Sequence, residues 1–264
     1  MPEPVPAATI LLLRDAAAGL EVFLVERHHA IDFATGALVF PGGKLEPGDH
    51  DPRALARSAG WPGDADALAL RVAAIRETFE EAGVLLARPR GSAALVDAAR
   101  SSEIGGRHRT RLLAHEIGVA DLAEAEDLEL ATDCLVPFAH WITPEFMPKR
   151  FDTHFFLVQA PPGQAAVHDG SESVDSTWAT PAAALAEAEA GRRTILFPTL
   201  LNLRKLGRSR SVAEALERAR RAPLVTVLPR VERRSGRAVV CIPPEADYDV
   251  TEATPAELER GPRA

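Results

Sequence analysis

The sequence predicts an α/β protein in which helices flank a mixed sheet within a single domain, residues 1–264. The first observation is a β-rich opening, where short apolar runs are separated by turn residues. The second is that strand and helix patterns then follow one another without strict alternation, which favours a mixed sheet. The third is size, because 264 residues of which 46% are hydrophobic can bury a sizeable core without an internal repeat or a long low-complexity linker.

Strands are predicted wherever apolar, β-branched or aromatic residues form short runs between turn signals. The first two runs, 8–13 and 20–27, are joined by the turn "RDAAAG", and a third ends at "PGG". Strands resume after the middle of the chain, and two more surround a glycine-containing turn near its end. The later runs are 36–40, 134–143, 150–160, 173–180 and the pair within 223–244.

Helices are predicted from apolar periodicity together with capping residues. The clearest spans 64–83, with Asp64 or Asp66 as its cap and Gly83 as its stop. A mainly helical insert is expected over 84–131, and a C-terminal helix and strand pair over about 205–245. The remaining helical patterns are 51–60, 180–191 with Thr180 as cap, 197–207, and 211–221 with Ser211 and Glu214 in capping-box spacing. The last residues, 246–264, are polar enough that we expect a loosely ordered tail.

Charge and composition narrow the function classes. A net charge of −8 argues against nucleic-acid partners and against anionic membranes. No apolar run reaches the roughly 18 residues of a membrane span, and the first residues lack the basic start of a signal peptide, so a cytoplasmic protein is expected. Cys134 and Cys241 have no paired spacing that would indicate a disulfide framework or a zinc site.

An anionic helix face is the main functional signal. Within "AAIRETFEEAGVLL", residues 73–86, Glu80 and Glu81 lie within roughly 60° of Glu77 around the helix axis. Like charges at this spacing cost roughly 0.2–0.5 kcal/mol per pair, and anions oppose the dipole at a helix C-terminus. Arg76 balances only one of them, whereas a hard divalent cation such as Mg²⁺ takes carboxylate oxygens. A solvated glutamate face is the alternative.

The preceding stretch "FPGGKLEPGD" adds a second signal. Gly42 and Gly43 come directly after a strand, where the backbone can turn tightly and present amides or carbonyls to a phosphate or a metal. A lone Pro-Gly-Gly more often marks an ordinary turn.

Together these residues resemble the Nudix box, G-x5-E-x7-R-E-U-x-E-E-x-G-U, where U is a bulky apolar residue. Gly43 is followed after five residues by Asp49, and the run from Arg76 to Val84 reads "RETFEEAGV". Three departures are an aspartate at position 49, Thr78 at the first U, and 26 residues, 50–75, in place of seven, an insertion of 19.

The resemblance implies an α/β/α sandwich around a mixed sheet that uses Mg²⁺ or Mn²⁺ to hydrolyse a nucleoside diphosphate linked to another group. The strand pair near the C-terminus, predicted from the sequence pattern, adds a C-terminal β-hairpin extension to this fold. It implies that the carbonyl of Gly42 assists the metal ligands and that Arg76 holds a carboxylate in the catalytic cluster. Glu80 is the implied general base. The implied metal ligands are Glu77, Glu80, Glu81 and Gly42.

A narrower resemblance, over residues 7–245, is to bacterial relatives of the peroxisomal coenzyme A diphosphatase group. Arg27 matches a coenzyme A signature, whereas Asp32 reverses a charge in it. The implied substrate is therefore a small nucleotide-type molecule, with coenzyme A or acyl-coenzyme A as one option. ADP-ribose, a dinucleotide, or a non-catalytic nucleotide-binding module are alternatives, and a homodimer is compatible with each. Candidate substrate-binding residues are Arg27, Gly43, Lys44, Arg150 and Glu172.

Overall fold

The structure is a computed structural model that describes residues 2–27, 36–60, 63–170, 173–234 and 237–260. Its centre is a nine-stranded mixed sheet with the order β10-β3-β2-β1-β8-β7-β11, in which β4 also pairs with β1 and β9 with β2. The strands are β1 (Val5–Ala16), β2 (Gly19–Arg27), β3 (Ala37–Val39), β4 (Gly42–Lys44), β7 (Val136–Ile142), β8 (Phe151–Gln159), β9 (Ser173–Ala179), β10 (Thr194–Ile195) and β11 (Thr226–Val227).

The pairing of β1 places the predicted glycine pair inside the sheet. The C-terminal part of β1 pairs with β2 as an antiparallel hairpin, and Val5 to Leu13 pair in parallel with β8. At its N-terminal part β1 also pairs with β4, where Ala8 lies opposite Gly43. The stretch read as a turn from "PGG" is therefore a short strand.

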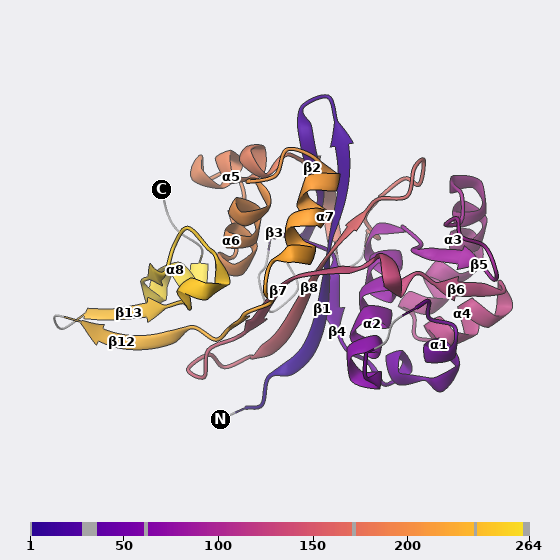
Figure 1. Ribbon diagram of the computed structural model, residues 1–264, viewed down its shortest axis with the longest axis horizontal. Helices are drawn as coiled ribbons and strands as arrows, with labels where there is room; N and C mark the ends of the chain where they lie inside the picture. Colours follow the sequence, from indigo (N-terminus) through magenta and orange to yellow (C-terminus); the bar gives the residue numbers. More distant parts are fainter. Residues whose placement is uncertain (1, 28–35, 61–62, 171–172, 235–236, 261–264) are drawn as a thin grey trace.

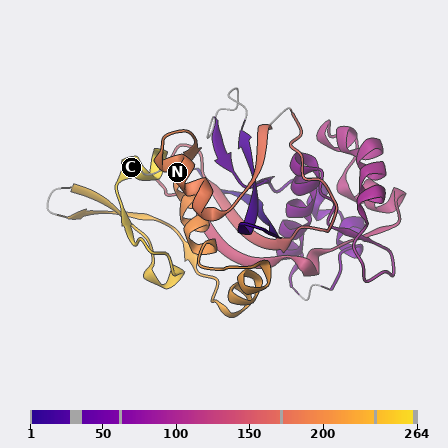
Figure 2. The same ribbon diagram turned by 90° about the horizontal axis from the view of Figure 1, so that it is seen from above.

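Helices cover both faces of this sheet (Figure 1), and Figure 2 shows the same layers from above. Helix α2 (Ala65–Ala82) lies on one face, capped by the side chain of Asp64 and ended by Gly83 in the left-handed conformation, as predicted. Apolar residues on the two faces of β1 enter two separate cores, Ile10 and Leu12 on the α2 side and Leu11 and Leu13 on the other. The second face is covered by α5 (Pro181–Glu189), α6 (Phe197–Leu206) and α7 (Val212–Arg221).

The expected helical insert packs against the outer side of α2. It contains α3 (Ala98–Leu113) and α4 (Val119–Ala125), together with a small antiparallel sheet of β5 (Ala87–Pro89) and β6 (Leu128–Leu130). Ile104 and Leu112 of α3 share one core with residues of α2 and β1. Helix α2 therefore packs between the sheet and the helical insert.

The insertion within the box forms defined structure. Its first residues follow the short 3₁₀ helix η1 (Pro47–His50) and form α1 (Pro52–Ala56). Its last residues form the first turns of α2. Arg53 of α1 forms ion pairs with Asp121 and Glu124 of α4. The insertion is therefore fastened to the helical insert.

The C-terminal segment forms the expected hairpin and continues beyond it. Strands β12 (Arg230–Arg234) and β13 (Arg237–Cys241) pair with each other, β14 (Glu252–Ala253) joins β13, and α8 (Pro255–Arg260) follows. The expectation of a loosely ordered tail is wrong for residues 246–253, because Tyr248 is buried and its hydroxyl bonds to Trp141 and Asn202. Among the helices of the described residues, none is long and apolar enough to cross a membrane.

Candidate functional site

The three glutamates of α2 are buried rather than solvated. The exposed fractions of Glu77, Glu80 and Glu81 are 9%, 6% and 6%. The alternative of a solvated glutamate face is therefore wrong, because β4 and the loop that carries Asp49 lie against this face of α2. Burying several like charges is costly unless they are paired or bind a cation.

Arg76 is the centre of the carboxylate cluster formed by Asp49, Glu77, Glu80 and Glu81. Its Nε and Nη2 donate to the two oxygens of Asp49 at 2.8 and 3.0 Å. Its Nη1 donates to Glu77 at 2.9 Å and Glu80 at 2.7 Å, and Nη2 also donates to the carbonyl of Lys44. These bonds use all five N–H groups of the guanidinium. Arg76 therefore fixes the cluster by direct contact.

Asp49, which stands where the family pattern has glutamate, is completely buried. Its carboxylate receives the bidentate bond from Arg76 and a further bond from the amide of Glu46 at 2.8 Å. The aspartate thus anchors the loop before α2 to the helix. Its carboxylate is used in holding Arg76.

The glycine pair brings β4 against the same carboxylates. The amide of Gly42 donates to Glu81 at 2.8 Å. A Cβ atom on Gly43 would lie only 2.2 Å from Oε1 of Glu77, so only glycine allows this approach. The structure thus connects Gly42 to the cluster through its N–H group, whereas metal binding by its carbonyl stays a prediction.

The cluster raises the pKa values of two of its carboxyl groups. Burial raises the pKa of Glu77 to about 7, with Arg76 opposing the rise and Glu80 adding to it. Burial likewise raises the pKa of Glu80 to about 7 against the effect of Arg76. Burial alone would lower the pKa of Arg76, but its hydrogen bond to Asp49 and the surrounding carboxylates outweigh that effect and raise it.

The donor set fits a hard divalent cation. Three buried carboxylates, those of Asp49, Glu77 and Glu80, contact the single guanidinium of Arg76, and Glu81 lies beside them on the amide of Gly42. One guanidinium balances only one of the negative charges that it contacts. Hard cations such as Mg²⁺ and Mn²⁺ take carboxylate oxygens. Glu77, Glu80 and Glu81 are the residues that would hold the ion, since Asp49 is used by Arg76.

A cationic residue of the helical insert offsets the negative charge at the C-terminus of α2. Arg109 of α3 donates from Nε to the carbonyl of Glu80 at 3.0 Å and from Nη2 to the carbonyl of Val167. A cation at this position is favourable for the helix dipole, which the three glutamates oppose. Sequence reasoning missed Arg109, because nothing in the local pattern of 98–113 indicates which helix end it reaches.

The predicted substrate-binding residues lie in different surroundings. Arg27 ends β2 opposite Ser173, and its Nε is buried without a hydrogen-bond partner among the described residues. Lys44 is exposed beside the cluster at the end of β4. Arg150 donates to the carbonyls of Thr143 and Pro2, so it ties two backbone segments together. Glu172 lies outside the described residues.

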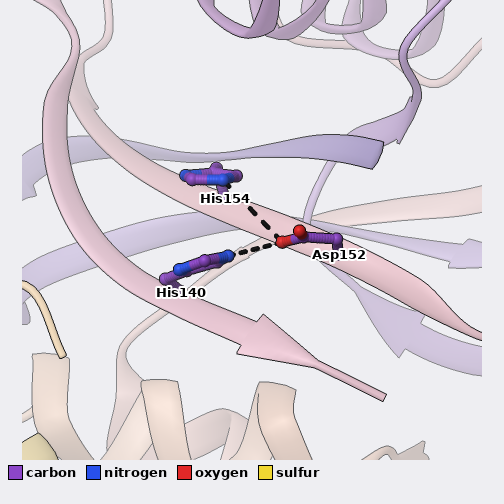
Figure 3. A group of neighbouring side chains, drawn as sticks. All are labelled: His140, Asp152 and His154. Atoms are coloured by element: carbon purple, nitrogen blue, oxygen red, sulfur yellow. Dashed lines mark hydrogen bonds and ion pairs between the residues drawn. The ribbon is translucent and has the colours of Figure 1, made fainter. Parts of the chain in front are cut away.

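A second group of titratable side chains lies on β7 and β8 (Figure 3). Nε2 of His140 contacts Oδ1 of Asp152, and Nε2 of His154 lies 3.8 Å from the same oxygen. The two imidazole rings stack with their centroids 4.0 Å apart. Burial, followed by the neighbouring His140, lowers the pKa of His154 to about 4 against the effect of Asp152. The alternation of side chains along a strand is enough to place Asp152 and His154 on one face of β8. His140 joins them only through the pairing of β7 with β8, which no local pattern shows.

Comparison with known proteins identifies the family. A family model described as the NUDT19 Nudix domain matches residues 53–206, more than half of the chain and including the glutamates of α2. The chain belongs to the Nudix hydrolase family. The resemblance drawn from the box residues and from the coenzyme A diphosphatase group is thereby confirmed.

Curated Nudix relatives are similar at low identity. The chain is 28% identical over 185 residues to the putative nudix hydrolase 7 of Caenorhabditis elegans, covering 70% of this chain and 55% of the relative. The Xenopus laevis protein named acyl-coenzyme A diphosphatase NUDT19 is 25% identical over 228 residues, covering 70% and 59%. The human protein of that name is 28% identical over 223 residues, covering 64% and 55%. The chain spans a little over half the length of these relatives.

A solved structure supports the predicted fold. The crystal structure of a Nudix hydrolase from Alicyclobacillus acidocaldarius has a TM-score of 0.67 and 27% sequence identity, and the match covers 82% of this chain and 97% of that one. The α/β/α sandwich around a mixed sheet is therefore confirmed for this Nudix protein.

Proposed function

We propose that this Nudix protein hydrolyses a pyrophosphate bond in a nucleoside diphosphate linked to another moiety, using Mg²⁺ or Mn²⁺. The observation that carries the proposal is the buried carboxylate cluster, whose charge Arg76 balances only in part. A bound cation would stabilise a cluster of this kind. The positive charge of the cation would in turn attract the phosphate oxygens of the substrate. Glu77, Glu80 and Glu81 are proposed to be the ligands, with the carbonyl of Gly42 beside them.

When bound, the ion would neutralise developing charge on the phosphate oxygens and lower the pKa of the attacking water. The chain's own residues position this chemistry. Arg76 holds Glu77 and Glu80 at fixed distances, and Gly42 fixes Glu81 through its amide. Arg76 occupies Oε2 of Glu80, so we assign both contact with the ion and acceptance of the water proton to Oε1, which has two lone pairs. The positive charge of the ion would lower the pKa of this carboxyl group from about 7, so Glu80 would be ionised and able to accept a proton at neutral pH.

Two features support substrate contacts outside the cluster. Nε of Arg27 is a buried donor that has no partner within the part of the chain that the structure describes, and a phosphate oxygen would supply one. Lys44 adds an exposed cation beside Gly43. Arg150 is a weaker candidate than predicted, since its guanidinium already binds two backbone carbonyls.

The substrate proposed first is coenzyme A or an acyl-coenzyme A, because two of the relatives carry the name acyl-coenzyme A diphosphatase. ADP-ribose and dinucleotides are the alternatives within the same chemistry. A non-catalytic nucleotide-binding module is the alternative outside it, and the presence of all three glutamates in the helical part of the box argues against that. A cytoplasmic location, a homodimer and the absence of nucleic-acid partners stay predictions.

Turnover of a substrate panel tests the proposal. The panel comprises coenzyme A, an acyl-coenzyme A, ADP-ribose, NADH and a diadenosine polyphosphate, each with Mg²⁺ or Mn²⁺. We expect cleavage of one class by the wild type and its loss in Glu80→Gln and Glu81→Gln at unchanged circular dichroism. Glu116→Gln, which carries the same change on an exposed segment, is the matched control. No turnover, together with nucleotide-dependent thermal stabilisation, would instead establish the binding module.

A further inference from the structure

The side chains of His140, Asp152 and His154 form a compact group outside the carboxylate cluster. Ligand atoms of the three residues all lie within 4.8 Å of one another. The Nε2 atoms of both histidines are directed at the same carboxylate oxygen of Asp152 (Figure 3). Three donors converge here from two adjacent strands, which are rigid elements that fix their spacing.

The spacing of these atoms is close to that around a metal ion. A zinc ion lies about 2.0–2.2 Å from imidazole nitrogens and carboxylate oxygens, so two ligand atoms on it are separated by about 3.3 Å. The 3.8 Å between Nε2 of His154 and Oδ1 of Asp152 requires only a small adjustment, whereas the hydrogen bond between His140 and Asp152 would have to open to admit the ion. The histidine and aspartate side chains are 14–31% exposed, which leaves the group open to an ion and to water.

An outer contact orients one of the imidazoles. Nδ1 of His140 lies 2.8 Å from the hydroxyl of Thr226 on β11, and this contact fixes the ring so that Nε2 faces Asp152. Metal-binding histidines usually have such a partner at their second ring nitrogen. Burial keeps His154 neutral at pH 7, and the neutral imidazole is the form that binds metals.

The group lies on the same face of the sheet as the glutamates of α2. His154 pairs with Ala8 of β1, and Ala8 pairs with Gly43 of β4. Paired residues point to one face, and a Cβ on Gly43 would point at Glu77. Two strand spacings separate the Cα atoms of His154 and Gly43 by about 10 Å. The two groups are therefore neighbours without sharing a ligand.

We propose that His140, Asp152 and His154 bind one divalent ion of borderline softness, such as Zn²⁺, at a site separate from the carboxylate cluster. Two imidazoles and one carboxylate favour ions of this class, whereas the all-oxygen cluster favours Mg²⁺. A bound ion here adds positive charge to the sheet face that also carries the glutamates. The proposal does not depend on hydrolytic activity.

Zinc titration of the full chain tests this site. The protein is first stripped with a chelator and then titrated with Zn²⁺ by calorimetry in excess Mg²⁺, which occupies the carboxylate cluster but competes poorly for imidazole. We expect one equivalent of Zn²⁺ to bind to the wild type. His154→Ala and Asp152→Asn should each weaken this binding by more than about 100-fold, and Thr226→Val by about 10-fold. Asp152→Asn preserves side-chain size, so it keeps the test valid if an alanine variant unfolds.

Two further measurements separate this site from other zinc binding. Co²⁺ in place of Zn²⁺ should give visible absorption that is lost in the same variants. His168 lies outside the proposed site, and its ring contacts Ser176. The variant His168→Ala should therefore still bind one equivalent of Zn²⁺. Zinc binding that is absent from the folded wild type, or that survives both His154→Ala and Asp152→Asn, would overturn the proposal.

Discussion

Replacing Gly43 with alanine should displace Glu77 while leaving the fold intact. A Cβ at this position would lie 2.2 Å from Oε1 and 2.5 Å from Cδ of Glu77, where ordinary contact begins at 3.4 Å. The carboxylate must therefore move by about 1 Å, and a misplacement of about 1 Å costs roughly 100-fold in rate. The neighbours that must yield are the end of a flexible side chain, so the free energy of unfolding should change by less than about 1 kcal/mol.

Gly42→Ala, in contrast, should lower the stability of the fold. Its Cβ would lie 2.4 Å from the carbonyl oxygen of Ala8 and 2.7 Å from Cα of Thr9, which are backbone atoms of the paired strand. Relieving that overlap requires β4 to separate from β1 and should lower the free energy of unfolding by about 1–3 kcal/mol. Gly48→Ala is the matched control, since a Cβ there meets no atom within 4 Å.

Mn²⁺ binding measured by electron paramagnetic resonance, substrate turnover and urea unfolding together separate these outcomes. We expect Gly43→Ala to lose Mn²⁺ affinity and turnover at wild-type stability, Gly42→Ala to lose stability, and Gly48→Ala to change neither. If Gly43→Ala binds Mn²⁺ as the wild type does, then Glu77 is not a ligand in the position that the structure gives it. If it unfolds as readily as Gly42→Ala, the steric reasoning is wrong.

Three further predictions concern stability. Asp49→Glu restores the residue of the family pattern but adds a methylene to a completely buried site, so it should lower the free energy of unfolding by about 1–3 kcal/mol in urea titrations. Tyr248→Phe should cost about 1–3 kcal/mol, because it leaves the buried partners Trp141 and Asn202 without their hydroxyl; an unchanged melting temperature would show that the tail is not packed there. The pKa of Glu126 is lowered chiefly by its hydrogen bond to Arg107, with His108 and Arg100 adding to the effect, so its contribution is present above the ordinary value of 4.5 and is lost as the pH falls through the lowered pKa. Melting temperatures from pH 7 to 3 should therefore show a deficit in Glu126→Gln that shrinks on acidification, whereas a deficit that persists at pH 3 would contradict this assignment.

Local sequence signals predicted much of the fold. Gly83 was identified as a helix stop, Thr180 and Ser211 as caps, and either Asp64 or Asp66 as the cap of α2. The structure confirms Gly83, Thr180 and Ser211 and selects Asp64. These signals depend on hydrogen bonds within a few residues, so the sequence contains them directly. The anionic face of α2 was visible for the same reason, because helical geometry alone places its glutamates together.

Features that depend on contacts between distant segments could not be predicted. The sequence did not show that β4 and the loop that carries Asp49 would lie against the glutamate face of α2, where burial raises the pKa values of Glu77 and Glu80. Arg109 reaches the end of α2 across 29 positions, and His140 meets His154 only through the register of β7 and β8. Periodicity gives the face that a residue occupies, but it does not give the element that packs against that face.

The 19-residue insertion shows why the box tolerates a change of loop length. Its two ends are fixed by the contact between Asp49 and Arg76, so residues 50–75 form a loop between joined points. Lengthening such a loop from seven to 26 residues costs only about 1 kcal/mol of closure entropy. Burial of Val72 alone contributes about 1.5–3 kcal/mol, and Arg53 ties the loop to α4. The insertion can therefore be accommodated while the geometry of the carboxylates is held by Arg76.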